Sequence, residues 1–229
     1  QSGRTNTTGN SNVIIGDSSG YNTNASYNSF IGYQSGFNTT SGAYNTFFGY
    51  QAGKGNTTYK LTGASNVIIG YQSGLNTSSG FSNVFIGNQS GLSNTTGDNN
   101  TFLGYQSGYY NTTASYNTII GYRAGRGKET GITGTHNVFL GFNAGYNAKT
   151  VSHSTFIGTE SGFSDSTGSW NVFVGYRTGY SNTTGASNTL IGQNAGDQNT
   201  TGYGNTFLGA GSGQDNTEGF NNIFVGVNS

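Results

Sequence analysis

A short pattern of polar and apolar positions recurs along the chain. An Asn is followed by a β-branched or small residue, two apolar residues and a Gly, and this block appears thirteen times. The spacing is seventeen residues, shortened by one before Gly32 and lengthened by four before Gly70 and by three before Gly141. The closing glycines are Gly16, Gly32, Gly49, Gly70, Gly87, Gly104, Gly121, Gly141, Gly158, Gly175, Gly192, Gly209 and Gly226. So short a period predicts one rung of a β-solenoid per repeat.

Turn signals surround each predicted strand. A second Gly follows each closing Gly four residues later, from Gly20 to Gly213, and stretches such as 94–97 (Asn-Thr-Thr-Gly) indicate a third turn. The two fixed glycines indicate two places that need a positive φ or a close backbone approach. The longer repeats predict small surface loops near 54–61 and 126–132. We therefore expect an all-β fold, a parallel β-roll of thirteen coils that forms one array over 1–229 and is uncapped at both ends.

Both residues before the closing Gly are apolar in every repeat, so the strand has two apolar faces. Neighbouring strand residues point to opposite sides, and one column therefore fills the coil while the other points away from it. We assign to the coil interior the residue next to Gly, as in Ile31, Ile69, Ile86, Leu103, Ile120, Ile157 and Ile191. We assign to an outward column, the core between chains, the residue before it, as in Phe30, Phe47, Phe85, Phe102, Phe139, Phe156, Phe173, Phe207 and Phe224.

An outward column of this kind predicts self-association. It would expose more apolar surface than the roughly 300–600 Å² that soluble monomers leave uncovered. Three coils packed round an axis as a homotrimer would bury it. The alternative is a single coil wide enough to hold both columns inside.

Two further columns concern the corners of the coil. The residue three positions after the closing Gly is always Ser, Ala or Thr, which favours a tight inward corner. The leading Asn is present in every repeat except at Ser154, and stacked Asn side chains predict an amide ladder between rungs.

Composition narrows the classes of function. Charged residues are 7% of the chain and sum to zero, which argues against binding to nucleic acid or to an anionic membrane surface. No window reaches the roughly 18 apolar residues of a membrane span. With no Pro, 16 Tyr and 15 Phe, the chain does not have the composition of a disordered protein. The absence of Met indicates a processed or excised segment, and the absence of Cys fits a secreted microbial surface protein.

Catalytic and metal-binding groups are scarce. His136 and His153 lie at or beside the Asn position of a repeat, and a triad with Asp165 has no more support than chance in a Ser-rich chain. The acidic residues do not recur at one repeat position, unlike those of calcium-binding β-rolls. The Gly-rich stretches 125–128 and 209–213 do not match P-loop spacing. We expect no enzymatic activity, no catalytic residues, no metal and no cofactor.

Three repeated features suggest binding or modification. Aromatic residues recur after both glycines, as at Tyr33 and Tyr21, although packing along the rod explains them equally well. A Thr column is formed by Thr46, Thr101, Thr118, Thr155, Thr189 and Thr206. Asn-x-Ser/Thr sequons make candidate glycosylation sites of Asn6, Asn38, Asn56, Asn76, Asn94, Asn111, Asn182 and Asn199.

The blocks NVFIG, NTFLG and NTIIG, each followed by a small residue and Gly, resemble the head repeats of trimeric autotransporter adhesins, the YadA-like head. They also resemble related repeats of phage and bacterial tail fibres, and the resemblance covers essentially the whole chain. It implies a left-handed parallel β-roll in which three chains close one rod on a microbial surface.

The expected function is that of a non-enzymatic extracellular fibre or adhesin segment. Its expected partners are copies of itself, in a homotrimer or an end-to-end polymer, and a host receptor, matrix or glycan. The alternative function is a monomeric solenoid that binds ice or carbohydrate through its repeated Thr, Asn and aromatic face.

Overall fold

The computed structural model describes residues 1–55, 58 and 60–229, which divide into two compact units, Gln1–Ser115 and Tyr116–Ser229. The first unit contains the strands β1 (Val13–Ile15), β2 (Ser29–Ile31), β3 (Thr46–Phe48), β4 (Val67–Ile69), β5 (Val84–Ile86) and β6 (Thr101–Leu103). The second contains β7 (Thr118–Ile120), β8 (Val138–Leu140), β9 (Thr155–Ile157), β10 (Val172–Val174), β11 (Thr189–Ile191), β12 (Thr206–Leu208) and β13 (Ile223–Val225).

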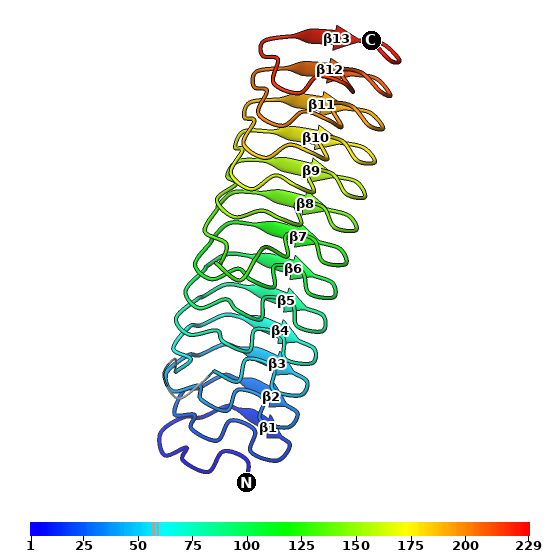
Figure 1. Cartoon of the computed structure of the whole chain (residues 1–229). Helices are drawn as coiled ribbons and strands as arrows, with labels where there is room; N and C mark the ends of the chain where they lie inside the picture. Colours follow the sequence, from blue (N-terminus) through cyan, green and yellow to red (C-terminus); the bar gives the residue numbers. More distant parts are fainter. Residues whose placement is uncertain (56–57, 59) are drawn as a thin grey trace. The chain divides into compact units, whose positions relative to one another are not determined.

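Within each unit the strands pair in parallel and in sequence order, and Figure 1 shows them stacked one per coil. The register joins equivalent repeat positions, as in Phe30↔Phe47 of the first unit and Phe156↔Phe173 of the second. The all-β parallel solenoid with a repeat of about seventeen residues is therefore confirmed. No helix in the described part of the chain is long and apolar enough to cross a membrane.

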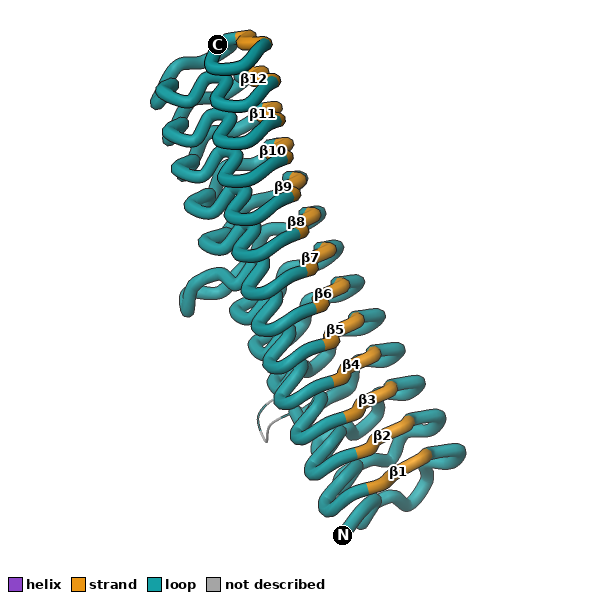
Figure 2. Tube along the Cα trace, turned by 90° about the vertical axis from the view of Figure 1, so that its right-hand side faces the viewer, coloured by secondary structure: helices purple, strands orange, loops and turns teal. Residues whose placement is uncertain are grey.

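Each strand is only three residues long, and turns make up the rest of the coil, as Figure 2 shows. The middle strand residue points into the coil and is buried in β2 to β12 and half-buried in the end strands β1 and β13, while the first and third residues point out. Phe30, Phe47, Phe85, Phe102, Phe156, Phe173 and Phe207 are 0% exposed, Phe139 is 2% exposed, and Phe224 is half-buried.

The assignment of the two apolar columns in the sequence analysis was therefore wrong. The Phe column is the core of the coil. The column next to Gly faces outward: Ile31, Ile69, Ile86, Ile120 and Ile157 are half-exposed, and Leu103 and Ile191 are 43% and 40% exposed. The alternative of one wide coil that holds both apolar columns inside is also wrong, because only the Phe column is buried.

Ring stacking explains why the coil takes phenyl groups inside. Phe30 and Phe47 stack with ring centroids 5.0 Å apart, and Phe139, Phe156 and Phe173 follow one another at 4.9 Å. Near-parallel rings at the spacing of the rungs fill the interior without a gap between coils. The coil of seventeen residues is thus wide enough for one phenyl ring per rung.

The two glycine columns have the roles that the sequence predicts. Gly49 has a φ of +134°, and a Cβ there would lie 2.5 Å from the carbonyl oxygen of Gly70 in the next coil. Gly53 has a φ of +54°, and a Cβ there would lie 2.6 Å from the ring of Phe47. The first column lets successive coils approach, and the second makes room for the core ring.

The leading Asn column forms the expected ladder, in which Oδ1 accepts from the backbone of the next coil. The Asn100 N–H donates to Asn83 Oδ1 (3.0 Å), and Asn83 Nδ2 donates to the Gly97 carbonyl (2.8 Å). In the second unit Ser154 replaces Asn, and its Oγ accepts from the Asn171 N–H at 3.1 Å. The small column three residues after the closing Gly is 0% exposed from Ser19 to Ser212, as at Ser90 and Ala124, so the predicted inward corner is confirmed.

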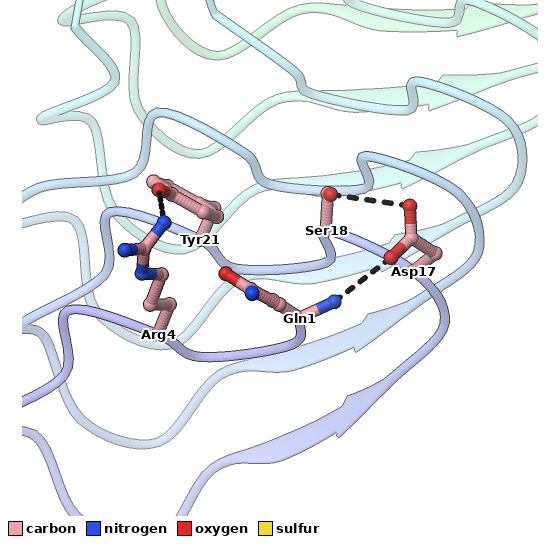
Figure 3. A network of polar contacts seen from close by, with 5 residues as sticks. All are labelled: Gln1, Arg4, Asp17, Ser18 and Tyr21. Carbon is pink, nitrogen blue, oxygen red and sulfur yellow. Dashed lines mark hydrogen bonds and ion pairs between the residues drawn. The ribbon is translucent and has the colours of Figure 1, made fainter.

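Polar contacts also join coils at the surface. Around the first coil, the Gln1 ammonium lies 2.8 Å from Asp17 Oδ1, and Arg4 Nη1 donates to the Tyr21 hydroxyl at 2.7 Å (Figure 3). The ammonium is the main cause of a lowered pKa at Asp17.

Candidate functional site

The outward side of the strands carries the exposed apolar surface of each unit. In the first unit Ile15 and Phe48 are 56% and 54% exposed, and in the second Leu140 is 40% exposed. The first residue of each strand, Thr or Val in most repeats, points to the same side because it is two positions from the third. No strand residue is charged.

Two exposed aromatic columns flank the strands in sequence. Directly after the closing Gly, Tyr33, Tyr50 and Tyr71 stack at 5.3 and 5.2 Å in the first unit. Five residues before the closing Gly, Tyr27 and Tyr44 stack at 5.1 Å. We call the strand positions and these flanking aromatic positions together the outward face.

Exposed large apolar side chains are confined to one part of the repeat. Among the described residues, each of them lies between six residues before the closing Gly and one residue after it, from Phe81 and Tyr27 at one limit to Tyr33 at the other. At the other corners of the coil the described large apolar side chains are buried or, like Tyr21, Phe37 and Leu75, half-buried. The apolar surface of each unit therefore gathers on the outward face.

The stacked rings present their edges to solvent. Tyr50 lies between Tyr33 and Tyr71 with interplanar angles of 18° and 8°, so both of its faces are covered. A sugar ring that stacks on an aromatic side chain needs a free aromatic face. Rings inside these columns therefore stabilise the stack of coils and do not form sugar platforms.

Both histidines lie in such a column in the second unit. Tyr116, His136, His153 and Trp170 stack in order, with ring centroids 4.8, 4.9 and 4.2 Å apart, and all four are exposed. Asp165 is fully buried and does not belong to this column. The triad that the sequence analysis rejected therefore has no counterpart here, and within the described residues no group of three or more His, Cys, Asp or Glu forms a metal site.

Asp165 stands in a buried corner column that other coils fill with Asn, Thr or Ala. Its Oδ2 accepts from Asn182 Nδ2 (2.9 Å) and Asn171 Nδ2 (3.1 Å), and its Oδ1 accepts from the Gly168 N–H (2.8 Å). Burial raises the pKa of Asp165 well above its usual range, although these hydrogen bonds act in the opposite direction. The group is a structural substitution in a ladder of amides.

Five of the candidate glycosylation sites are buried. Asn94, Asn111, Asn182 and Asn199 belong to this corner column and are 0% exposed, and Asn38, one position earlier in its repeat, is 6% exposed. Asn111 Nδ2, for example, donates to Asn94 Oδ1 at 3.0 Å, so its amide nitrogen is part of the ladder. The Asn side chain of the third turn thus points into the coil. The sequon pattern does not reveal the direction of this side chain.

Two of the other sequons, Asn6 and Asn76, are half-buried. Asn6 makes the same bond as Asn94, because its Nδ2 donates to the carbonyl of the Gly three residues on, Gly9, at 3.1 Å. Asn56 lies outside the described residues. The predicted sites at Asn6 and Asn76 stay predictions.

A glutamine ladder in the first unit was missed by the sequence analysis. Nε2 of each Gln donates to Oε1 of the Gln one coil earlier, at 2.9, 3.0, 3.3 and 2.9 Å through the series Gln34, Gln51, Gln72, Gln89 and Gln106. These residues have φ between 51° and 55°, a conformation that costs a non-Gly residue about 1–2 kcal/mol. The sequence does carry a signal for this ladder, because five Gln occur at the same repeat position.

Comparisons with protein-family models, curated proteins and solved structures return no match for this chain. The resemblance to autotransporter head repeats therefore stays a prediction from the repeated blocks.

Proposed function

We propose that the chain is a non-enzymatic structural segment of an extracellular fibre or adhesin, in which the outward face packs against further copies of the same chain. The observation that carries the proposal is the confinement of exposed large apolar side chains to that face. Soluble monomers rarely leave contiguous apolar patches of more than a few hundred Å² uncovered. A homotrimer about an axis, as in autotransporter heads, would cover three outward faces at once.

The solenoid itself suits a structural role. Each coil is joined to the next by Phe stacking inside and by Asn side chains that bond the backbone of the neighbouring coil. Every repeat contributes similar contacts, so stiffness extends along each unit through nearest neighbours. The chain has no Cys, so this stiffness needs no disulfide, and the segment would tolerate both oxidising and reducing surroundings.

Cysteine cross-linking tests the proposal directly because the natural chain contains no Cys. Ile86→Cys places a thiol on the outward column, and Thr96→Cys places one at an exposed position of another corner. In dilute solution with a mild oxidant, we expect covalent dimers from Ile86→Cys and mostly monomer from Thr96→Cys. Equal cross-linking of the two variants, or none, would count against packing through this face.

A second candidate function is favoured by the Thr column. Thr101 and Thr118, like the other members, stand at the first strand position and point outward with the apolar column. A monomer that uses this flat array to bind ice or carbohydrate would give thermal hysteresis or polysaccharide retention without self-association. The Val residues that replace Thr in other repeats fit general strand propensity better than a ligand lattice.

A further inference from the structure

A cavity of about 340 Å³ opens beside the first insertion, in the first unit. Its lining comes from three successive coils and includes Gln34, Phe37, Gln51, Lys54 and Leu75. These residues belong to the corner that follows the closing Gly and not to the outward face. The volume is at the lower end of the range for small-molecule sites, which fits a ligand of about one sugar ring.

Amide side chains supply polar groups of both kinds to the cavity. Gln51 uses one amide hydrogen on Gln34 Oε1 (2.9 Å), which leaves its second hydrogen and the Gln34 amide nitrogen for a ligand. Asn38 Oδ1 accepts from Asn22 Nδ2 at 2.7 Å, and Asn38 Nδ2 has no acceptor among the described residues. Asn76 adds a half-buried amide on the other side. Amides pair well with sugar hydroxyls, because each group is both donor and acceptor.

Phe37 stands at the end of an aromatic column, unlike rings such as Tyr50 that lie inside one. One face stacks on Tyr21, with centroids 5.0 Å apart. The next coil carries Lys54 at the equivalent position, so the aromatic column is interrupted there and no ring from that position stacks on the other face. Phe37 and Leu75 thus form an apolar wall against which the C–H groups of a pyranose can pack.

Lys54 gives the cavity a positive charge that has no ion-pair partner among the described residues. The ion pairs of the described residues are Gln1–Asp17 and Arg177–Asp197, and neither involves Lys54. The second insertion makes a contrast at the same repeat position, where Arg126 lies over the Tyr146 ring (5.6 Å) and donates to its hydroxyl (3.3 Å). In the second insertion the ring of Tyr146 thus contacts the cation. The residue equivalent to Tyr146 in the coil after Lys54 is Leu75, which has no ring.

We propose that this cavity binds a carboxylated pyranose, such as one hexuronic acid residue of an acidic polysaccharide. The carboxylate pairs with Lys54, the hydroxyls bond to the amides of Gln34, Gln51 and Asn38, and one face of the sugar lies on Phe37. The site uses none of the outward strand positions, so it does not depend on self-association.

The test uses the full chain and a matched pair of probes, methyl β-D-glucuronide and methyl β-D-glucoside, which differ at the carboxylate. Saturation-transfer NMR and titration should give a dissociation constant on the order of 1 mM for the glucuronide, as expected for about a dozen non-hydrogen atoms. The glucoside should bind roughly fivefold more weakly, the effect of one exposed ion pair.

Variants locate the binding. Lys54→Gln should reduce affinity for the glucuronide to that for the glucoside, and Gln34→Glu should reduce it by placing a competing carboxylate in the cavity. Lys128→Gln, an exposed lysine of the second insertion, is the control and should change nothing. Absence of glucuronide binding, binding unaltered in Lys54→Gln, or acetate binding as tight as glucuronide would overturn the proposal. Particle mass measured on the same variants reports separately on self-association.

Discussion

Asp165 is a buried carboxyl group in a column of amides, and its surroundings determine how pH affects stability. Its pKa is raised in the folded chain, mainly by burial. Folding therefore favours the protonated form. The contribution of Asp165 to stability is greatest below pH 3.8, its ordinary pKa, and is lost as the pH rises towards the folded pKa.

Asp165→Asn removes this loss, because an Asn there can bond as Asn182 and Asn199 do, with Nδ2 on a Gly carbonyl and Oδ1 accepting from the next coil. We expect the variant to be more stable than the natural chain at pH 7 by roughly 1–3 kcal/mol, with the difference shrinking towards pH 4. Urea unfolding of both proteins across this pH range measures it. A variant that is no more stable at pH 7 would show that the carboxylate is well satisfied where it is.

Asn83 tests the amide ladder next to the strands. Asn83→Ala leaves the buried Asn100 N–H without its acceptor, whereas the Gly97 carbonyl loses one donor and keeps the other, Asn94 Nδ2. We expect a loss of about 1–3 kcal/mol in the free energy of unfolding, which is the cost of one buried group without a partner.

Asn88→Ala is the matched control, because Asn88 is exposed and lies in a neighbouring part of the same coil. It should change stability by less than about 0.5 kcal/mol. Similar losses in the two variants would mean that the ladder contributes little beyond local turn formation.

Adjacent residues of strand β9 distinguish the two apolar columns. Phe156 is 0% exposed and stacked between Phe139 and Phe173, whereas Ile157 is half-exposed. Phe156→Ala should lower the free energy of unfolding by about 3–5 kcal/mol because it opens a cavity in the core. Ile157→Ala should cost less than about 1.5 kcal/mol in the isolated chain. Denaturant titration at low protein concentration compares them, and the reverse order would restore the assignment made from sequence.

The strands, their register and the turns follow from the repeated block alone. Asn at the start and Gly at the end define each strand, and the uniform period puts equivalent residues side by side, as in Phe85↔Phe102. The repeated block does not show which apolar column faces the interior. Side chains alternate along a three-residue strand in the same way whichever of its two faces is inside. The deciding contact is that of the core ring with the second glycine, as between Phe47 and Gly53, and it depends on the path of the corner.

Features at the corners were the least predictable. The sequons at Asn94 and Asn182 have the composition of an exposed turn, but their side chains turn inward to bond the Gly carbonyl three residues on. The cavity near Lys54 arises where an insertion interrupts an aromatic column, and the sequence analysis identified that insertion without a binding role. Such features depend on the direction in which a corner side chain points. The position of a residue within the repeat does not specify that direction by itself.

Each unit combines a stacked interior with one apolar outer face. The interior contacts are local to neighbouring coils, so they give stiffness without requiring a second chain. The outer face is different, because Ile15, Phe48 and Leu140 have no buried role within their own unit. The proposed function requires that copies of the chain pack against one another through this face.

Particle mass in dilute solution, measured by light scattering behind a sizing column, tests that requirement most directly. The single chain has a mass of 23.8 kDa. We expect a whole-number multiple of it, three for the trimer, and we expect the double variant Leu140→Lys, Ile157→Lys to elute at the single-chain mass with its unfolding transition retained. A natural chain that remains at 23.8 kDa at all concentrations would contradict self-association through the outward face.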